Sequence, residues 1–308
     1  MFNNYLNFPF TDGKGELAAL LAAGLWAVAS VLYGIVGQKI PPLQLNLVKG
    51  IVAIAFLCLT IWLTGESLPI SSPAPIFLLC LSGIVGISLG DTAFLAAINH
   101  LGARRVLLIG TLSPPITAIA ANIVLSEQLN LSAWCGILLT IMGVAWVVTE
   151  RVPNTDDSYP QHLWRGVGFG VLAAITNATG TVISRLAFAT GSVTPLWAAL
   201  LRLSAAVLVL VVWLWFNRQR QVLSYPYWQS WRVVLTSCFA AFFGTYLGIW
   251  LQQTAIKFTA AGIASTLLQT SPLFVIPLAM CMGEKVSWRA IAGVIIAIIG
   301  IGLLFYLK

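Results

Sequence analysis

The fold of this chain is decided by residues 105–144, which read RVLLIGTLSPPITAIAANIVLSEQLNLSAWCGILLTIMGV. The stretch holds two long apolar runs, and its one acid, Glu127, lies between them. A helix needs about 20 mostly apolar residues to cross the hydrocarbon of a membrane. Pro114 interrupts the first run, and Gly136 and Gly143 lie two helical turns apart in the second. We therefore predict two consecutive membrane-spanning helices, residues 106–125 and 132–150, with a bend at the proline.

The same pattern returns in residues 262–303, which read GIASTLLQTSPLFVIPLAMCMGEKVSWRAIAGVIIAIIGIGL. Here Pro272 is again followed by an acid, Glu284, and then by two glycines, Gly293 and Gly300. We predict a bend at Pro272 as well. The correspondence extends upstream, where residues of the third and fourth apolar segments recur 158 positions later: Gly86, Gly90, Ala97, Ser113 and Pro114 return as Gly244, Gly248, Ala255, Ser271 and Pro272.

The composition requires lipid as the solvent for most of the chain. Of its 308 residues, 59% are apolar or aromatic and only 8% are charged, and the mean hydropathy is +0.94. A soluble domain carries roughly 25% charged residues, so disordered chains, DNA-binding modules and secreted disulfide scaffolds are excluded. Ten segments are long and apolar enough to span a membrane: 16–36, 43–64, 75–98, 106–125, 132–150, 165–187, 195–216, 232–255, 260–280 and 288–307.

The ten segments form two repeats of five, residues 16–150 and 165–307. Because five is an odd number, the second repeat enters the membrane from the opposite side, so we predict an all-α membrane protein with two inverted five-helix repeats. Two oppositely oriented copies of one fold can exchange conformations, closing one side of a central site while the other side opens. The sequence therefore predicts a secondary transporter that works by alternating access.

Polar side chains follow one face of the first helix in each repeat. They are Trp26, Ser30 and Tyr33 in the first segment and Asn177, Thr181 and Ser184 in the sixth. Side chains of this kind gain little from facing lipid tails, so we expect them to line a substrate cavity, the alternative being hydrogen bonds between helices. Further polar candidates for the same space are Gln252, Gln253, Gln269 and Asn122.

Three ionisable residues, Lys49, Asp91 and Arg202, lie well inside predicted spans, where an unpaired charge is costly. Lys49 and Asp91 lie about 9 Å and about 10 Å from the same membrane face, so we predict that they pair. Asp91 is also a candidate for proton uptake during transport. Arg202 is the repeat counterpart of Lys49, but Ile249 stands where its acid would be. We expect Arg202 either to bind an anionic substrate group or to be neutralised by carbonyl groups and Glu127.

The two quoted stretches resemble the EamA-like members of the drug/metabolite transporter superfamily. Each has a proline within a helix, a Glu in the short loop that follows, and a final helix that carries glycines. The resemblance covers residues 16–307 and implies a ten-helix exporter of small organic metabolites such as amino acids, without identifying the substrate. The small four-helix drug exporters of the superfamily use a Glu in the middle of helix 1. This helix has only Glu16, at its start, so that proton-coupling residue is not carried over.

Three rival functions are a passive channel, a membrane-embedded enzyme and a scaffold that transports nothing. An enzyme needs catalytic groups inside the membrane, whereas His100 and His162 lie at helix ends, so we expect no enzyme and no catalytic residue. The five cysteines lack the paired spacing of a metal site, and the basic residues form no dense stripe for nucleic acid. We therefore expect no metal, no cofactor and no nucleic acid. The expected partners are the lipid bilayer and a small-molecule substrate, and the oligomeric state is left open.

We expect a multi-pass protein of the cell membrane, and residues 1–15 show no signal-peptide pattern. The two indicators of orientation disagree. The positive-inside rule puts both termini outside the cell, whereas the family resemblance implies that both are cytoplasmic. Loops after odd-numbered helices hold Lys39, Arg104, Arg105, Arg151, Arg165, Arg218, Arg220, Arg232, Lys285 and Arg289, and the opposite face holds Lys14, Arg185, Lys257 and Lys308.

Overall fold

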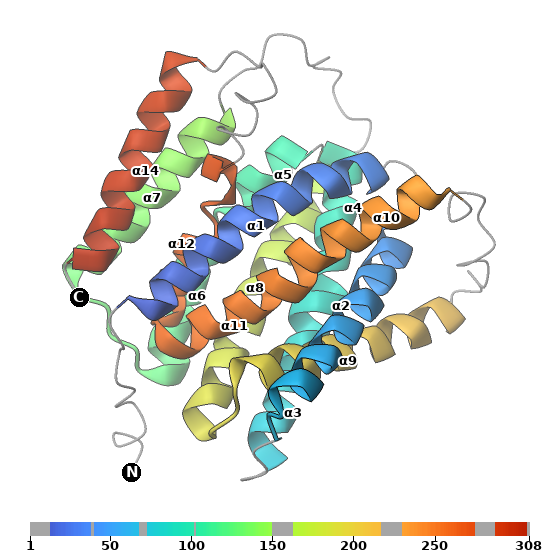
Figure 1. Ribbon diagram of the computed structural model, residues 1–308. Coiled ribbons are helices and arrows are strands. Elements are labelled where there is room, and N and C mark those ends of the chain that lie inside the picture. Colours follow the sequence, from blue (N-terminus) through green and yellow to red (C-terminus); the bar gives the residue numbers. More distant parts are fainter. Residues whose placement is uncertain are drawn as a thin grey trace.

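The computed structural model describes residues 13–37, 40–67, 73–101, 103–149, 163–216, 230–274 and 287–306, and in these residues it contains helices and no strand (Figure 1). Glu284, predicted as the counterpart of Glu127, lies outside them. The helices of the first half are α1 (Lys14–Gly37), α2 (Pro42–Thr64), α3 (Pro73–Gly83), η1 (Ile84–Asp91), α4 (Thr92–Leu101), α5 (Ala103–Gly110), α6 (Ser113–Leu125) and α7 (Leu131–Thr149). Those of the second half are α8 (Leu163–Thr190), α9 (Pro195–Phe216), α10 (Trp231–Ala240), η3 (Ala241–Leu247), α11 (Gly248–Phe258), α12 (Ala261–Leu268) and α14 (Trp288–Tyr306).

The outer surface of this helical bundle is apolar, while some of its charged side chains are buried. Leu131 and Trp164 are 80% and 82% exposed, whereas Arg185 and Arg202 are each 3% exposed. This distribution is the reverse of that in a soluble protein, and it fits a bundle whose outer face meets lipid. Among the described residues, six helices are long and apolar enough to cross a membrane: Pro42–Thr64, Pro73–Leu101, Val106–Leu125, Leu163–Thr190, Pro195–Phe216 and Trp231–Phe258. The predicted all-α membrane class is confirmed, and the count of ten crossing helices stays a prediction.

The third helix of each half contains a π-helical stretch at the same place in the repeat. These stretches are η1, of eight residues, and η3, of seven residues. They lie around the glycine pairs Gly86–Gly90 and Gly244–Gly248, which the sequence analysis assigned to the repeat pattern. A π-helical turn widens the helix locally and is frequent at functional sites. The sequence predicted the third helices but not this local change of winding.

The fourth helix of each half is interrupted next to its proline. In the first half, α5 ends at Gly110 and α6 begins at Ser113, so Pro114 is the second residue of a new helix. In the second half, α12 ends at Leu268 and helix resumes at Ser271, one residue before Pro272. Proline is well tolerated in a first helical turn, because its missing N–H has no partner there in any case. Each proline therefore lies just after a break in the span.

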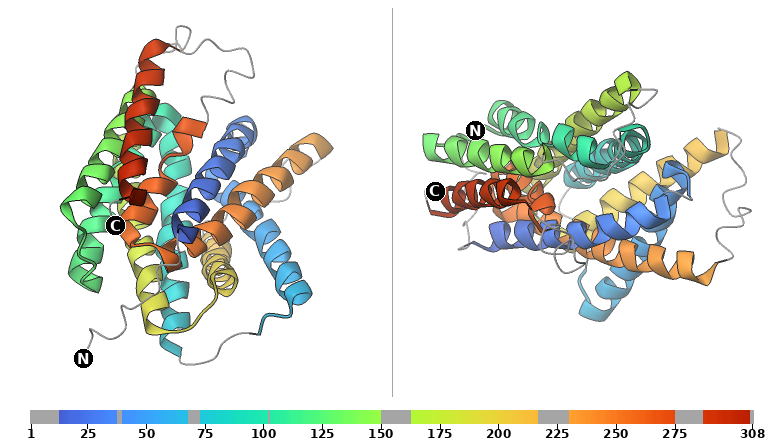
Figure 2. Two further views of the ribbon diagram at one scale, coloured as in Figure 1. Left: turned by 60° about the vertical axis from the view of Figure 1, so that its left-hand side comes forward. Right: turned by 90° about the horizontal axis from the view of Figure 1, so that it is seen from above.

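Helices that correspond between the two halves pack against each other in antiparallel fashion. The fifth helices, α7 and α14, lie side by side in Figures 1 and 2. Their contacts join Gly136 to Gly300 and Gly143 to Gly293, so residue numbers rise along one helix as they fall along the other. The second helices, α2 and α9, also pack together. Antiparallel packing of a helix on its own counterpart requires a two-fold axis in the membrane plane, which is the geometry of inverted repeats.

The first helix of each half packs on the third helix of the other half. α1 contacts α10, η3 and α11, and α8 contacts α3, η1 and α4. Both crossings use small residues: a Cβ added at Gly180 would lie 3.1 Å from the Cα of Gly86, and one added at Gly244 would lie 2.6 Å from the Cβ of Ala29. Small residues at crossings let helix backbones approach closely. The two halves are therefore interlocked, and the polar residues described next lie at these crossings.

Candidate functional site

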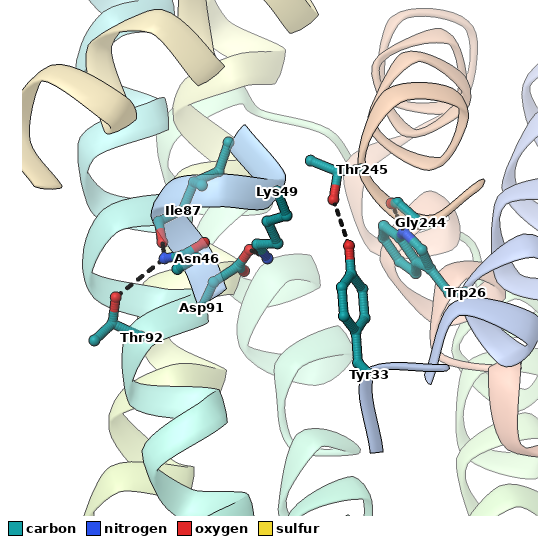
Figure 3. Close-up of polar contacts among 9 residues, drawn as sticks. All are labelled: Trp26, Tyr33, Asn46, Lys49, Ile87, Asp91, Thr92, Gly244 and Thr245. Carbon is teal, nitrogen blue, oxygen red and sulfur yellow. Dashed lines mark hydrogen bonds and ion pairs between the residues drawn. The ribbon is translucent and has the colours of Figure 1, made fainter. Parts of the chain in front are cut away.

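Two side chains of α1 bind the π-helical stretch of the opposite half. The indole nitrogen of Trp26 donates to the carbonyl of Gly244 at 2.8 Å, and the hydroxyl of Tyr33 lies 3.0 Å from the hydroxyl of Thr245 (Figure 3). Both Trp26 and Tyr33 are half-buried. Ser30, predicted on the same face, is exposed, and its hydroxyl donates to the carbonyl of Ala27 in its own helix. Two of the three predicted residues of α1 therefore connect the halves.

Lys49 of α2 and Asp91 at the end of η1 form an ion pair, with 2.5 Å between Nζ and Oδ2. Their side chains are 12% and 31% exposed. The Lys49 ammonium also lies 5.9 Å from the centre of the Tyr33 ring, within range of a cation–π interaction. Figure 3 shows the Lys49–Asp91 pair beside the contact between Tyr33 and Thr245. The structure thus brings together polar residues from α1, α2, η1 and η3.

Asn46, one turn before Lys49 on α2, is a member of this group that the sequence analysis missed. Its amide donates to the carbonyl of Ile87 at 3.0 Å and to the hydroxyl of Thr92 at 3.1 Å (Figure 3). Ile87 lies within η1, so Asn46 binds the main chain of the π-helical stretch. The i, i+3 spacing of Asn46 and Lys49 is the signal that would have identified it.

The corresponding crossing of α8 with the third helix of the first half is also polar, at the end of α3. The hydroxyl of Ser82 donates to the carbonyl of Gly180 at 2.6 Å, and it lies 2.9 Å from the hydroxyl of Ser184. Thr181 is buried, and its hydroxyl donates to the carbonyl of Asn177 in the same helix. The predicted residues of α8 therefore lie at the interface between halves, with Thr181 bonded within its own helix.

The interruptions of the two fourth helices lie close to each other. Gln269 follows α12, and its Oε1 lies 3.8 Å from the position of a Cβ added at Gly110, the last residue of α5. The hydroxyl of Ser113, which begins α6, donates to Oδ1 of Asn177 at 3.3 Å. Thr117 also bonds across the halves, to Ser265. The breaks thus form a second polar group on the two-fold axis, joined to α8 through Asn177.

Arg202 of α9 is buried beside the α8–η1 crossing. Its Nη2 lies 3.2 Å from the position of a Cβ added at Gly86, and its Nε and Nη1 are buried and have no hydrogen-bond partner within the described residues. Asp91 is the acid that interacts with it electrostatically. The expectation that Glu127 neutralises Arg202 is wrong, because Glu127 binds Arg185.

Arg185, near the end of α8, forms a buried network that the sequence analysis did not predict. Its Nε lies 2.5 Å from Oε1 of Glu127, and its Nη1 donates to the carbonyls of Ile256 and Lys257 at 2.9 and 2.6 Å. The other oxygen of Glu127 accepts the N–H of Ala261, at the start of α12. The side chains of Arg185 and Glu127 are 4% and 9% exposed. This network joins both halves at one membrane face, whereas Arg185 was counted among the surface charges.

The remaining polar candidates are Gln252, Gln253 and Asn122. Gln252 and Gln253 of α11 are buried, and the amide atoms of Gln253 have no partner within the described residues, while Asn122 is exposed. No cluster of three or more His, Cys, Asp or Glu that could hold a metal ion occurs in the part of the chain that the structure describes.

Replacing Asp91 with asparagine is expected to destabilise the protein by about 1–3 kcal/mol, because it leaves the Lys49 ammonium inside the membrane without its carboxylate. Thermal unfolding in detergent measures this loss. The double variant Lys49→Gln/Asp91→Asn is the control, and it is expected to lose less than Asp91→Asn alone, because it removes both charges together. Equal losses in the two variants would contradict an interaction between the charges.

Comparison with known proteins places these observations in context. A model of the EamA-like transporter family matches residues 13–149 and again residues 164–306. A solved structure described as "Crystal structure of protein" has a TM-score of 0.78 to this chain at 15% identity, and the match covers 96% of this chain and 98% of that one. At this identity the likeness shows a shared fold and nothing about substrate. A search of curated proteins found no match.

Proposed function

Because this chain belongs to the EamA-like transporter family, we propose that it is a secondary transporter that exports small organic metabolites, such as amino acids, across the cell membrane by alternating access. The family assignment makes it an integral, multi-pass membrane transporter of small molecules. The moving units are the two repeats, residues 16–150 and 165–307.

The observation that supports alternating access is the exchange of first helices between the halves. Since α1 packs on the third helix of the second half and α8 on that of the first, a shift at one crossing has an equivalent at the other. The two crossings are related to each other by the inversion of the repeats. In one arrangement of the halves the central site is therefore open to one side of the membrane, and in the equivalent arrangement with the roles of the halves exchanged it is open to the other side.

The polar residues between the halves are the proposed substrate site. Trp26, Tyr33, Asn177 and Gln269 are proposed to contact the substrate, with Ser30, Thr181 and Arg202 as further members. Lys49 and Asp91 are the proposed charged or coupling pair. The breaks before Pro114 and Pro272 support this assignment, because interrupted helices expose backbone polar groups that only protein, water or a substrate can satisfy inside a membrane.

The test is flux into proteoliposomes that hold the purified protein, measured over a panel of labelled amino acids and other metabolites, with and without a pH gradient. A carrier is expected to show saturable flux that is accelerated by the same substrate on the opposite side. Conducted current without saturation would favour a channel, a chemically altered solute would favour an enzyme, and absence of solute-dependent flux would overturn transport. Export is tested separately, by faster loss of a preloaded substrate from cells that produce the protein.

A further inference from the structure

We propose that Arg202 is the binding site for a carboxylate and that the transported molecules carry a carboxylate group, as amino acids do. This inference rests on the proposed function, which it sharpens by naming a substrate class. Its basis is a buried guanidinium of which two nitrogens, Nε and Nη1, have no hydrogen-bond partner within the described residues.

Arg202 is 3% exposed, and both Nε and Nη1 are buried without an acceptor in the described part of the chain. A guanidinium presents five N–H donors in a planar fork, and buried donors of this kind are normally satisfied. The fork matches the two oxygens of a carboxylate, which it binds through two parallel hydrogen bonds. A carboxylate therefore supplies the hydrogen-bond acceptors that Nε and Nη1 of Arg202 lack within the described residues.

The charged groups around Arg202 leave an excess of positive charge. Four acids lie in the described residues: Glu16, Glu66, Asp91 and Glu127. Asp91 attracts Arg202 but is paired with Lys49 at 2.5 Å, and Glu127 is paired with Arg185. Glu66 lies in the loop after α2, where it accepts from Thr194, and Glu16 lies in the first turn of α1. Lys49, Asp91 and Arg202 together therefore carry one net positive charge, which a single anionic group neutralises.

Arg202 lies where the two halves meet. Arg202 corresponds to Lys49 in the repeat, so the two cations approach the centre from opposite faces. Its side chain lies against Gly86, at the crossing of α8 with η1, and its main chain lies against Gly83. A movement that separates α9 from η1 exposes the guanidinium to the face that opens. The anion site thus lies at the contact between α9 and η1, which separate in the proposed transport cycle.

The experiment measures the thermal unfolding of the purified full-length protein in detergent with a series of monocarboxylates, each compared with its own uncharged amide. Carboxylates are expected to raise the unfolding temperature and the amides to leave it unchanged. Arg202→Gln is expected to abolish the difference, and Arg202→Lys to weaken carboxylate binding roughly tenfold to a hundredfold, since the lysine cannot form the bidentate contact. Arg165→Gln, at an exposed position on the adjacent α8, is the control and is expected to bind as the unaltered protein does.

The outcomes separate this inference from the proposed function. Equal shifts by carboxylates and amides in the unaltered protein, or an undiminished shift in a folded Arg202→Gln variant, would overturn the carboxylate site. Proteoliposomes that carry only solutes without a carboxylate would also overturn it, while leaving transport itself intact. Binding of carboxylates without any solute flux would support the site and count against a transporter. The comparison of carboxylate with amide needs no variant, so it holds even if Arg202→Gln fails to fold.

Discussion

Replacing Arg185 with leucine is expected to lower the free energy of unfolding by about 3–5 kcal/mol, the usual cost of breaking a buried ion pair. The change leaves the Glu127 carboxylate, 9% exposed, without its cation, and it removes the donors to the carbonyls of Ile256 and Lys257. It also releases the attachment of the loop after α6 to α8 and α11. Denaturation of the purified protein in mixed detergent micelles measures the loss.

Arg165→Leu is the matched control for this prediction, because Arg165 lies on the same helix and is exposed. Its stability is expected to stay within about 0.5 kcal/mol of the original. The double variant Arg185→Leu/Glu127→Leu is expected to lose less than the sum of the two single losses, since the charges depend on each other. If Arg185→Leu and Arg165→Leu were equally stable, the buried network would have no energetic importance.

Replacing Gly83 with alanine is expected to cost about 1–3 kcal/mol and to reduce substrate flux by more than the stability loss explains. A Cβ at this position would lie 2.6 Å from the Cα and the carbonyl carbon of Arg202. Because these are main-chain atoms, they cannot rotate away, and α9 must move from α3. The displaced helix carries Arg202, so flux and stability are measured on the same preparation.

The control for Gly83→Ala is Gly168→Ala on α8, where an added Cβ has no atom within 4 Å. There the substitution is expected to be neutral or to stabilise the helix by about 0.5–1 kcal/mol, because alanine is the better helix former. Full stability and full flux in Gly83→Ala would show that α3 and α9 are free to separate at no cost, against the close packing described above.

Much of the fold could be predicted from the sequence because the residues that recur in the two repeats are ones that close helix packing requires at fixed positions. Gly136, Gly143 and Gly300 recur at fixed spacing since two helix backbones meet there, and an odd number of spans per repeat dictates the inversion. The contact between Lys49 and Asp91 could be predicted from their equal depth in the membrane, because an unpaired charge is costly there and two opposite charges at one depth can pair.

Other features depend on contacts that no local pattern records. Arg185 lies five residues from the end of α8, and its burial is decided by the loop after α6 and by the end of α11, which are remote in sequence. Depth in the membrane also does not distinguish Arg185 from Arg202 as the partner of Glu127, because both cations lie toward the same membrane face, and only the contacts show that Arg185 is the partner. The π-helical winding of η1 and η3 has no signature in hydropathy, since it changes the path of the backbone and not the identity of the side chains.

The crossing of α1 with the third helix of the other half has a consequence for biogenesis. The hydrogen bond from Trp26 to Gly244 joins residues 218 positions apart, so the first helix is synthesised long before the helix against which it packs. Non-local contacts of this kind slow folding, because a long loop must close before they form. A nascent chain that has released only its first five helices still lacks the partner of its first, and the two halves reach their final form as one event late in synthesis.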